Sequence, residues 1–157
     1  MKTKMNLIGL CFLLGSCLIS CADQEGEWFE QPFVRISTAA GQSSSVVLSD
    51  VKNVNTYYVY LSSAPLNDEL IVNYEVLVGD GLQNGVDYEM VTQGNTLSFL
   101  PGIYDAPIRI RWMANRVDPA KNNTITIRLT GNSHGFTLGY PGPSGLQSQL
   151  IIEKKNN

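Results

Sequence analysis

The chain has little of what catalysis or metal binding needs. It contains a single histidine, His134, which lies between Ser133 and Gly135, so we expect a solvated loop residue there. After residue 20 there is no Gly-x-Ser-x-Gly, no His-Glu-x-x-His, no phosphate-binding glycine loop and no paired cysteine spacing. A carboxylate pair such as Asp80 and Asp87 could serve a catalytic role, and two loop acids are the simpler interpretation. The sequence predicts no catalytic residue, metal ligand or cofactor.

Long hydrophobic runs are also missing. Residues Met1–Met5 carry two lysines, and Leu7–Leu14 is apolar but shorter than the roughly 20 residues that a membrane-spanning helix requires. The segment ends in Leu18-Ile19-Ser20-Cys21, which resembles the lipobox of bacterial lipoproteins. That resemblance implies cleavage before Cys21, followed by acylation of its sulfur and its amine. An ordinary secretory signal ending near Ser20, with no anchor, is the alternative.

Lipidation of Cys21 makes membrane lipid the expected partner, because two or more acyl chains suffice for stable anchoring. Cys11 and Cys17 lie in the segment that would be removed, so the mature chain could form no intrachain disulfide. Removal of residues 1–20 leaves 137 of the 157 residues, enough for one domain with its own hydrophobic core.

Positive charge is scarce once the signal is removed. Nine basic residues then face fourteen acidic ones, and the formal net charge moves from −3 to −5. This balance disfavours nucleic acid as a partner. Residues 21–32 are acidic and predict a tether. Ala22-Asp23-Gln24-Glu25 resembles the export tags of surface lipoproteins, so we expect an outer-membrane protein at the cell surface, with a periplasm-facing position as the alternative.

From residue 33 to residue 157 no stretch keeps a helical 3.6-residue repeat, and short runs of β-branched and aromatic residues alternate with Gly, Asn, Asp and Pro. This pattern predicts one all-β domain, an immunoglobulin-like antiparallel β-sandwich of seven or eight strands. The expected strands are Phe33–Thr38, Ser44–Leu48, Thr56–Ser62, Glu69–Val78, Asn95–Leu100, Pro107–Met113, Thr124–Thr130 and Gln147–Glu153.

Alternation within these strands predicts which side chains face the core. Trp112 follows Ile108 and Ile110 at every second position and is therefore expected in the core, not on a ligand platform. The other inward residues expected in this way are Tyr57, Val59, Leu61, Leu70, Val72, Tyr74, Val76, Val78, Ile125, Ile127 and Leu129.

Two exposed features could contact a ligand. Tyr58 and Tyr60 share the outward face of one strand, and rigid aromatic rings suit contacts with sugars or proteins. Tyr140 lies in the Pro- and Gly-rich loop Gly139–Gly145, which could present it at the surface. The alternatives are that a sheet, a loop or the tether covers the first pair, and that the loop is only a connector.

Several motifs in the centre of the chain resemble the Calx-beta repeat. They are Val72-Asn73-Tyr74-Glu75-Val76, Gly85-Val86-Asp87-Tyr88, Thr96-Leu97-Ser98-Phe99-Leu100-Pro101-Gly102 and the closing Phe136-Thr137-Leu138-Gly139. With the lipobox, the chain resembles small Calx-beta-like lipoproteins of Bacteroidetes-type bacteria. Gly85 and Gly102 are expected at positive φ, Asp87 is expected to brace a turn, and Tyr88 is expected to bury its ring with its hydroxyl on a backbone partner.

Calcium sites in that family gather several carboxylates at one end of the sandwich, since this hard cation takes about six to eight oxygen ligands. Here the stretch Ala114–Asn123 holds one carboxylate and two cations, so no working calcium site is expected. The predicted function is a non-enzymatic, membrane-anchored lipoprotein that presents a binding surface to a protein or a glycan. An accessory subunit of an outer-membrane glycan-uptake system, or a calcium-stiffened spacer, are the alternatives.

Overall fold

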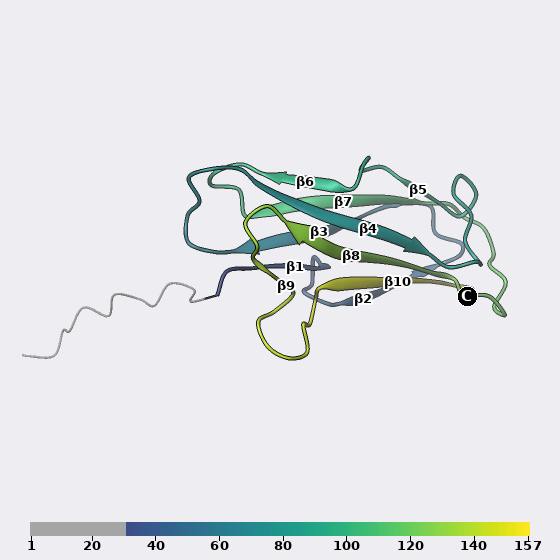
Figure 1. Cartoon of the computed structure of the whole chain (residues 1–157). Coiled ribbons are helices and arrows are strands. Elements are labelled where there is room, and N and C mark those ends of the chain that lie inside the picture. Colours follow the sequence, from purple (N-terminus) through teal and green to yellow (C-terminus); the bar gives the residue numbers. More distant parts are fainter. Residues whose placement is uncertain (1–30) are drawn as a thin grey trace, which may run out of the picture.

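The computed structural model describes residues 31–157, and its strands form two five-stranded sheets packed face to face (Figure 1). Sheet A has the order β5-β7-β3-β1-β9, and sheet B has the order β2-β10-β8-β4-β6. The strands are β1 (Phe33–Thr38), β2 (Ser44–Leu48), β3 (Val54–Ser62), β4 (Leu70–Val78), β5 (Tyr88–Met90), β6 (Thr96–Phe99), β7 (Asp105–Trp112), β8 (Thr124–Asn132), β9 (Thr137–Leu138) and β10 (Gln149–Lys155). The predicted all-β sandwich is confirmed.

The expected signal segment, the lipid-bearing Cys21 and nearly all of the expected tether lie outside the described residues. Within residues 31–157 there is no helix that is long and apolar enough to cross a membrane.

All eight expected strands are present, and β1 and β2 have the expected bounds. The two further strands, β5 and β9, are only three and two residues long, too short for alternation to reveal them. The sequence predicts an antiparallel sandwich, and the structure differs at two pairs of strands. β9 pairs with β1 in parallel, and β2 pairs with β10 in parallel. Both parallel pairs lie at the same side of the molecule, where the chain passes from β1 in sheet A to β2 in sheet B.

The inner faces of the two sheets form one hydrophobic core. Its residues include the expected inward set of β3 and β7, and Trp112 is fully buried. Val78 is the exception to the predicted alternation, since it is exposed. The reason is that β6 pairs only with Leu70–Asn73, so the second half of β4 has no neighbour on that side and less of the core covers it.

A tight turn carries the chain from β6 in sheet B to β7 in sheet A. Pro101 and Gly102 occupy its centre, Gly102 has φ +85°, and the Ile103 N–H donates to the Leu100 carbonyl at 2.9 Å. Proline followed by a residue with positive φ is the signature of a type II turn, which requires glycine at that position. The predicted role of Gly102 is confirmed, and Gly85 has the expected positive φ as well.

The strands run along the long axis of the sandwich. The chain enters the described region at one end, beside the β3–β4 and β6–β7 connections, and the C-terminal residue lies at the opposite end (Figure 1). These two ends are called the entry end and the C-terminal end below.

Candidate functional site

Tyr58 and Tyr60 lie on the outer face of sheet A. Their strand, β3, is the central strand of the sheet, and the register places Tyr60 between Arg35 of β1 and Asp105 of β7. The inward neighbours of the two tyrosines along β3 are buried, whereas Tyr58 and Tyr60 are half-buried. Their ring centroids are 5.8 Å apart with an interplanar angle of 32°, so the two rings form one continuous aromatic surface.

Tyr140 reaches the same surface from the loop after β9. The Arg35 guanidinium lies 4.4 Å from the ring centroid of Tyr60 and 5.4 Å from that of Tyr140, within the range of cation–π attraction. Phe33 adjoins the group, with its ring centroid 5.3 Å from that of Tyr140. We call Phe33, Arg35, Tyr58, Tyr60 and Tyr140 the Arg35 cluster. The structure thus joins two surfaces that the sequence analysis treated separately.

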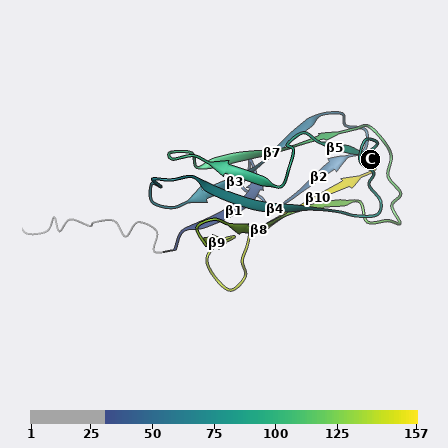
Figure 2. The same cartoon turned by 45° about the horizontal axis from the view of Figure 1, so that its top comes forward.

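The loop that carries Tyr140 is fixed against sheet A. It leaves the sandwich beside β1, as Figures 1 and 2 show. Its neck is closed by a hydrogen bond of 2.7 Å from the Tyr140 N–H to the Leu146 carbonyl. Gly139 sits in that neck with φ +84°, and a Cβ there would come within 2.6 Å of the Gly145 carbonyl oxygen. The closed neck of the loop therefore holds Tyr140 beside Arg35.

Sequence reasoning missed two residues of the cluster, Phe33 and the charged Arg35. Arg35 Nη1 donates to the Gln147 side-chain oxygen at 2.9 Å and to the Ser37 hydroxyl at 3.1 Å. None of these acceptors is charged, and Arg35 has no ion pair within residues 31–157. The alternation of Phe33–Thr38 was the available signal, since it places Arg35 opposite the buried Val34 and Ile36.

A second polar group lies inside the C-terminal end of the sandwich. The Lys154 ammonium is fully buried and donates to Asp87 Oδ1 and to the Met113 carbonyl, both at 3.0 Å. Asp87 Oδ2 accepts the Gln83 N–H at 2.9 Å, so the prediction that Asp87 braces a turn is confirmed. Asp87 lies in a turn, as expected, but it is only 4% exposed and is held by the lysine.

The surroundings of Asp87 favour its ionised form. Burial by itself raises the pKa of the carboxyl group, but three partners outweigh it and hold the pKa below the ordinary value. These partners are the backbone N–H of Gln83, the Lys154 ammonium and the side-chain amide of Asn115. The charged pair thus joins the segment around Asp87 to the segment after β7 and to the end of β10.

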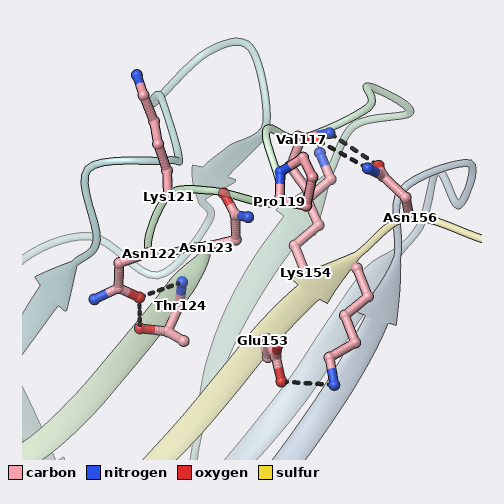
Figure 3. Close-up of a pocket in the computed structure, with 10 residues that line it drawn as sticks. Val117, Pro119, Lys121, Asn122, Asn123, Thr124, Glu153, Lys154 and Asn156 are labelled. Carbon is pink, nitrogen blue, oxygen red and sulfur yellow. Dashed lines mark hydrogen bonds and ion pairs between the residues drawn. The ribbon is translucent and has the colours of Figure 1, made fainter.

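The pocket at the same end of the molecule is poor in carboxylates. A surface pocket of about 390 Å³ opens beside β10, and its lining is rich in lysine and amide side chains (Figure 3). Glu153 is the carboxylate in that lining, and it pairs with Lys155 at 3.1 Å. No group of three or more His, Cys, Asp or Glu side chains suited to a metal ion occurs among residues 31–157. Asp87 is the one buried carboxylate among residues 31–157, and the Lys154 ammonium lies against it.

Millimolar calcium is therefore expected to leave the melting temperature unchanged. A site saturated a hundredfold would add about 2.7 kcal/mol to the free energy of unfolding, a large shift for a domain of this size. Thermal unfolding with calcium and with a chelator measures the difference. A large stabilisation by calcium that the chelator reverses would contradict the expectation that this end of the domain binds no calcium.

Two other residues named from the sequence, His134 and Tyr88, differ in their surroundings from what was expected, whereas Asp80 does not. His134 lies in a turn, as expected, but its side chain is only 20% exposed: its ring lies 5.3 Å from that of Phe136, and its Nε2 is 3.2 Å from Asp68 Oδ1. Tyr88 buries its ring as predicted, but its hydroxyl finds no backbone partner in the described part of the chain. Asp80 accepts the Asn122 N–H at 3.0 Å, so Asp80 and Asp87 have separate partners and form no catalytic pair.

Comparisons with known proteins identify the fold. CBD12 from CALX1.2 superimposes with a TM-score of 0.56 at 19% sequence identity, and the match covers 79% of this chain and 44% of that chain. No protein-family model matches the sequence, and no curated protein matches it. The chain therefore has a Calx-beta-like fold and spans less than half of the solved chain that it resembles. At this identity the likeness concerns the fold alone.

Proposed function

We propose that the protein is a non-enzymatic, lipid-anchored binding module of the bacterial cell envelope, and that the Arg35 cluster is its contact surface for a glycan or a protein. The observation that carries this proposal is the contact of Arg35 with the rings of Tyr60 and Tyr140, next to Tyr58, with no acidic partner for Arg35 among residues 31–157. Aromatic rings and arginine are the side chains most enriched at binding hot spots. The rings stand on a five-stranded sheet and a closed loop, so little side-chain freedom is lost on binding.

The position of the cluster suits an anchored protein. Residues 22–32 would join the lipid-bearing Cys21 to β1 and span at most roughly 40 Å when extended. Arg35 lies two residues beyond Phe33, where β1 begins at the entry end. The contact surface would therefore be held close to the membrane. It would lie on the outer face of sheet A, which runs along the long axis of the sandwich. An outer-membrane, surface-facing location follows from the acidic residues after Cys21 and belongs to the same proposal.

A role as an accessory subunit of a glycan-uptake system is the second candidate. The feature that favours it is the pair of half-buried rings of Tyr58 and Tyr60 on the outer face of sheet A, because sugar rings stack on aromatic faces. The calcium-stiffened spacer has no comparable support, since a lysine ammonium occupies the buried carboxylate at the C-terminal end.

Replacement of Cys21 by serine tests the anchor. The substitution removes the only thiol that could be acylated in the mature chain, so the protein should leave the membrane fraction or remain as an uncleaved precursor. Cell fractionation and the mass of the product report both outcomes. Normal processing of Cys21→Ser together with unchanged membrane association would contradict the anchoring proposal.

Replacement of Tyr60 by alanine tests the contact surface. Tyr60 is half-buried on the outer face, so its loss should change the free energy of unfolding by no more than about 1 kcal/mol. Capture of a partner from outer-membrane extracts or on a glycan array should weaken at least tenfold, because the ring supports Arg35. Tyr104→Ala is the matched control: Tyr104 is an exposed tyrosine beside the β6–β7 turn, outside the cluster. Equal capture by the wild type and by Tyr60→Ala would place the contact surface elsewhere.

A further inference from the structure

The outer face of sheet A gathers positive charge in an acidic protein. Arg35 on β1 and Arg109 and Arg111 on β7 all point to this face, because their neighbours along each strand are buried. Arg111 pairs with Glu89 at 2.5 Å, whereas Arg35 and Arg109 have no ion pair within residues 31–157. Three of the nine basic residues after the signal thus share one sheet face, and an anionic ligand would find its complement here.

The two unpaired arginines flank the tyrosines. Arg109 lies opposite Thr56 and Arg35 lies opposite Tyr60, so Tyr58 stands between them along β3. From a strand spacing of about 4.8 Å and a rise of about 3.3 Å per residue, the Cα atoms of the two arginines are roughly 16 Å apart. Along the face, the Arg109 guanidinium is therefore followed by the rings of Tyr58 and Tyr60 and then by the Arg35 guanidinium. Tyr140 lies beyond Arg35.

Asp105 makes this face asymmetric. It lies on the β7 side of Tyr60, whereas Arg35 lies on the β1 side. The Arg35 guanidinium lies over one face of the Tyr60 ring. A ligand that contacts the free part of these rings would meet a hydrogen-bond acceptor on the β7 side and a charged donor on the β1 side. Hydroxyl groups suit the first position and a carboxylate suits the second, because guanidinium groups bind carboxylates with strong paired hydrogen bonds.

An extended acidic peptide fits this face less well. The backbone of β3 is already paired with β1 on one side and with β7 on the other, so a peptide could not add itself as a strand. Its carboxylates would also lie along both sides of the tyrosines, and some would face Asp105. A pyranose ring instead offers an apolar C–H face to a tyrosine, hydroxyls on one edge and, in a uronic acid, a single carboxylate.

We infer that the ligand of the Arg35 cluster is a glycan containing uronic acid units, whose carboxylate binds Arg35 while its sugar ring packs against the free part of the neighbouring tyrosine rings. This inference rests on the proposed function and adds the chemical class of the ligand. Nη1 of Arg35 is already engaged by Gln147 and Ser37, which orients the guanidinium, and no acceptor for Nε or Nη2 occurs within residues 31–157. Those donors are the ones assigned to the carboxylate.

Affinity electrophoresis and calorimetry of the detergent-solubilised full chain test this assignment. The probes are polygalacturonate, alginate and hyaluronan, with fully methyl-esterified pectin as the matched neutral polymer and poly-glutamate as the acidic peptide. We expect at least one carboxylated polymer to bind at least tenfold more tightly than the ester and the peptide. Arg35→Gln should lower that affinity at least tenfold, and 0.5 M salt should weaken it. Arg128→Gln, on the outer face of sheet B, should have no effect.

Several outcomes would overturn the inference. Equal binding of the methyl-esterified and carboxylated polymers would show that Arg35 does not bind a carboxylate of the ligand. Tighter binding of poly-glutamate would indicate that the ligand is an acidic protein. Absence of binding to all three carboxylated polymers would reject the ligand class. The proposed function is tested separately by the Tyr60→Ala capture experiment. A loss of partner capture in that variant would still support the contact surface if any of these results were obtained.

Discussion

Replacement of Lys154 by methionine is expected to lower the free energy of unfolding by about 3 to 5 kcal/mol. Methionine keeps most of the buried volume, but it leaves the Asp87 carboxylate inside the protein without its ammonium partner. Burial of an unpaired charge is among the largest single-residue penalties in a folded domain. Denaturant unfolding of the two proteins, followed by tryptophan fluorescence, measures the difference.

Lys155→Met is the matched control for this experiment. Lys155 is the next residue along β10, but it faces solvent and pairs with Glu153, so its loss should change stability by less than about 1 kcal/mol. The double variant Asp87→Asn, Lys154→Met removes both charges and should recover part of the stability lost by Lys154→Met alone. If Lys154→Met were as mild as Lys155→Met, the buried pair would have no role in holding this end together.

The same pair predicts how stability depends on pH. The folded-state pKa of Asp87 lies below its unfolded value of 3.8, so its contribution is present above that value and is lost as the pH falls through the folded pKa. Wild-type protein should therefore lose stability below about pH 4 more steeply than Asp87→Asn does. This comparison belongs to the same set of unfolding measurements.

Trp112→Ala should cost about 3 to 5 kcal/mol, since it removes the largest fully buried side chain of the core. The indole lies between the sheets next to Tyr88, with ring centroids 6.4 Å apart, and its truncation would leave a cavity that the surrounding strands cannot close. Thermal and denaturant unfolding report the loss, and the variant is expected to unfold near physiological temperature.

Two comparisons make the Trp112 result specific. Trp112→Phe should be milder, because it keeps an aromatic ring and removes an indole N–H that has no hydrogen-bond partner within residues 31–157. Tyr58→Ala, on the outer face, should change stability by no more than about 1 kcal/mol. A stable Trp112→Ala that lost ligand binding, or an unfolded Tyr58→Ala, would mean that the two faces of sheet A had been assigned the wrong way round.

Strand positions and inward faces could be predicted because a two-residue repeat is a local signal. The alternation around Tyr57–Leu61 and Ile108–Trp112 identified the core, and Ser44–Leu48 was placed without error. Lys154 was within reach of the same reasoning, since it follows Leu150 and Ile152 at every second position of β10. The predicted strand ended at Glu153, two residues before the end of β10 and just before Lys154, so the buried lysine was missed.

The candidate site could not be assembled from local patterns. Arg35 and Tyr140 are more than a hundred residues apart in the chain, and their contact depends on the parallel pairing of β9 with β1. A strand of two residues carries no alternation, and parallel neighbours are not implied by any adjacent turn. The surroundings of His134 were missed for a similar reason, because Asp68 comes from a distant loop.

The entry end and the C-terminal end lie opposite each other, and this determines how the domain would respond to a pulling force. A pull between them would act along the strands, since both β1 and β10 lie parallel to the long axis (Figure 1). The hydrogen bonds that join β1 to β3 and β10 to β8 run perpendicular to this direction, so each ladder would be loaded in shear and its bonds would have to break together. A domain tethered at β1 and loaded at its far end would transmit tension without opening strand by strand.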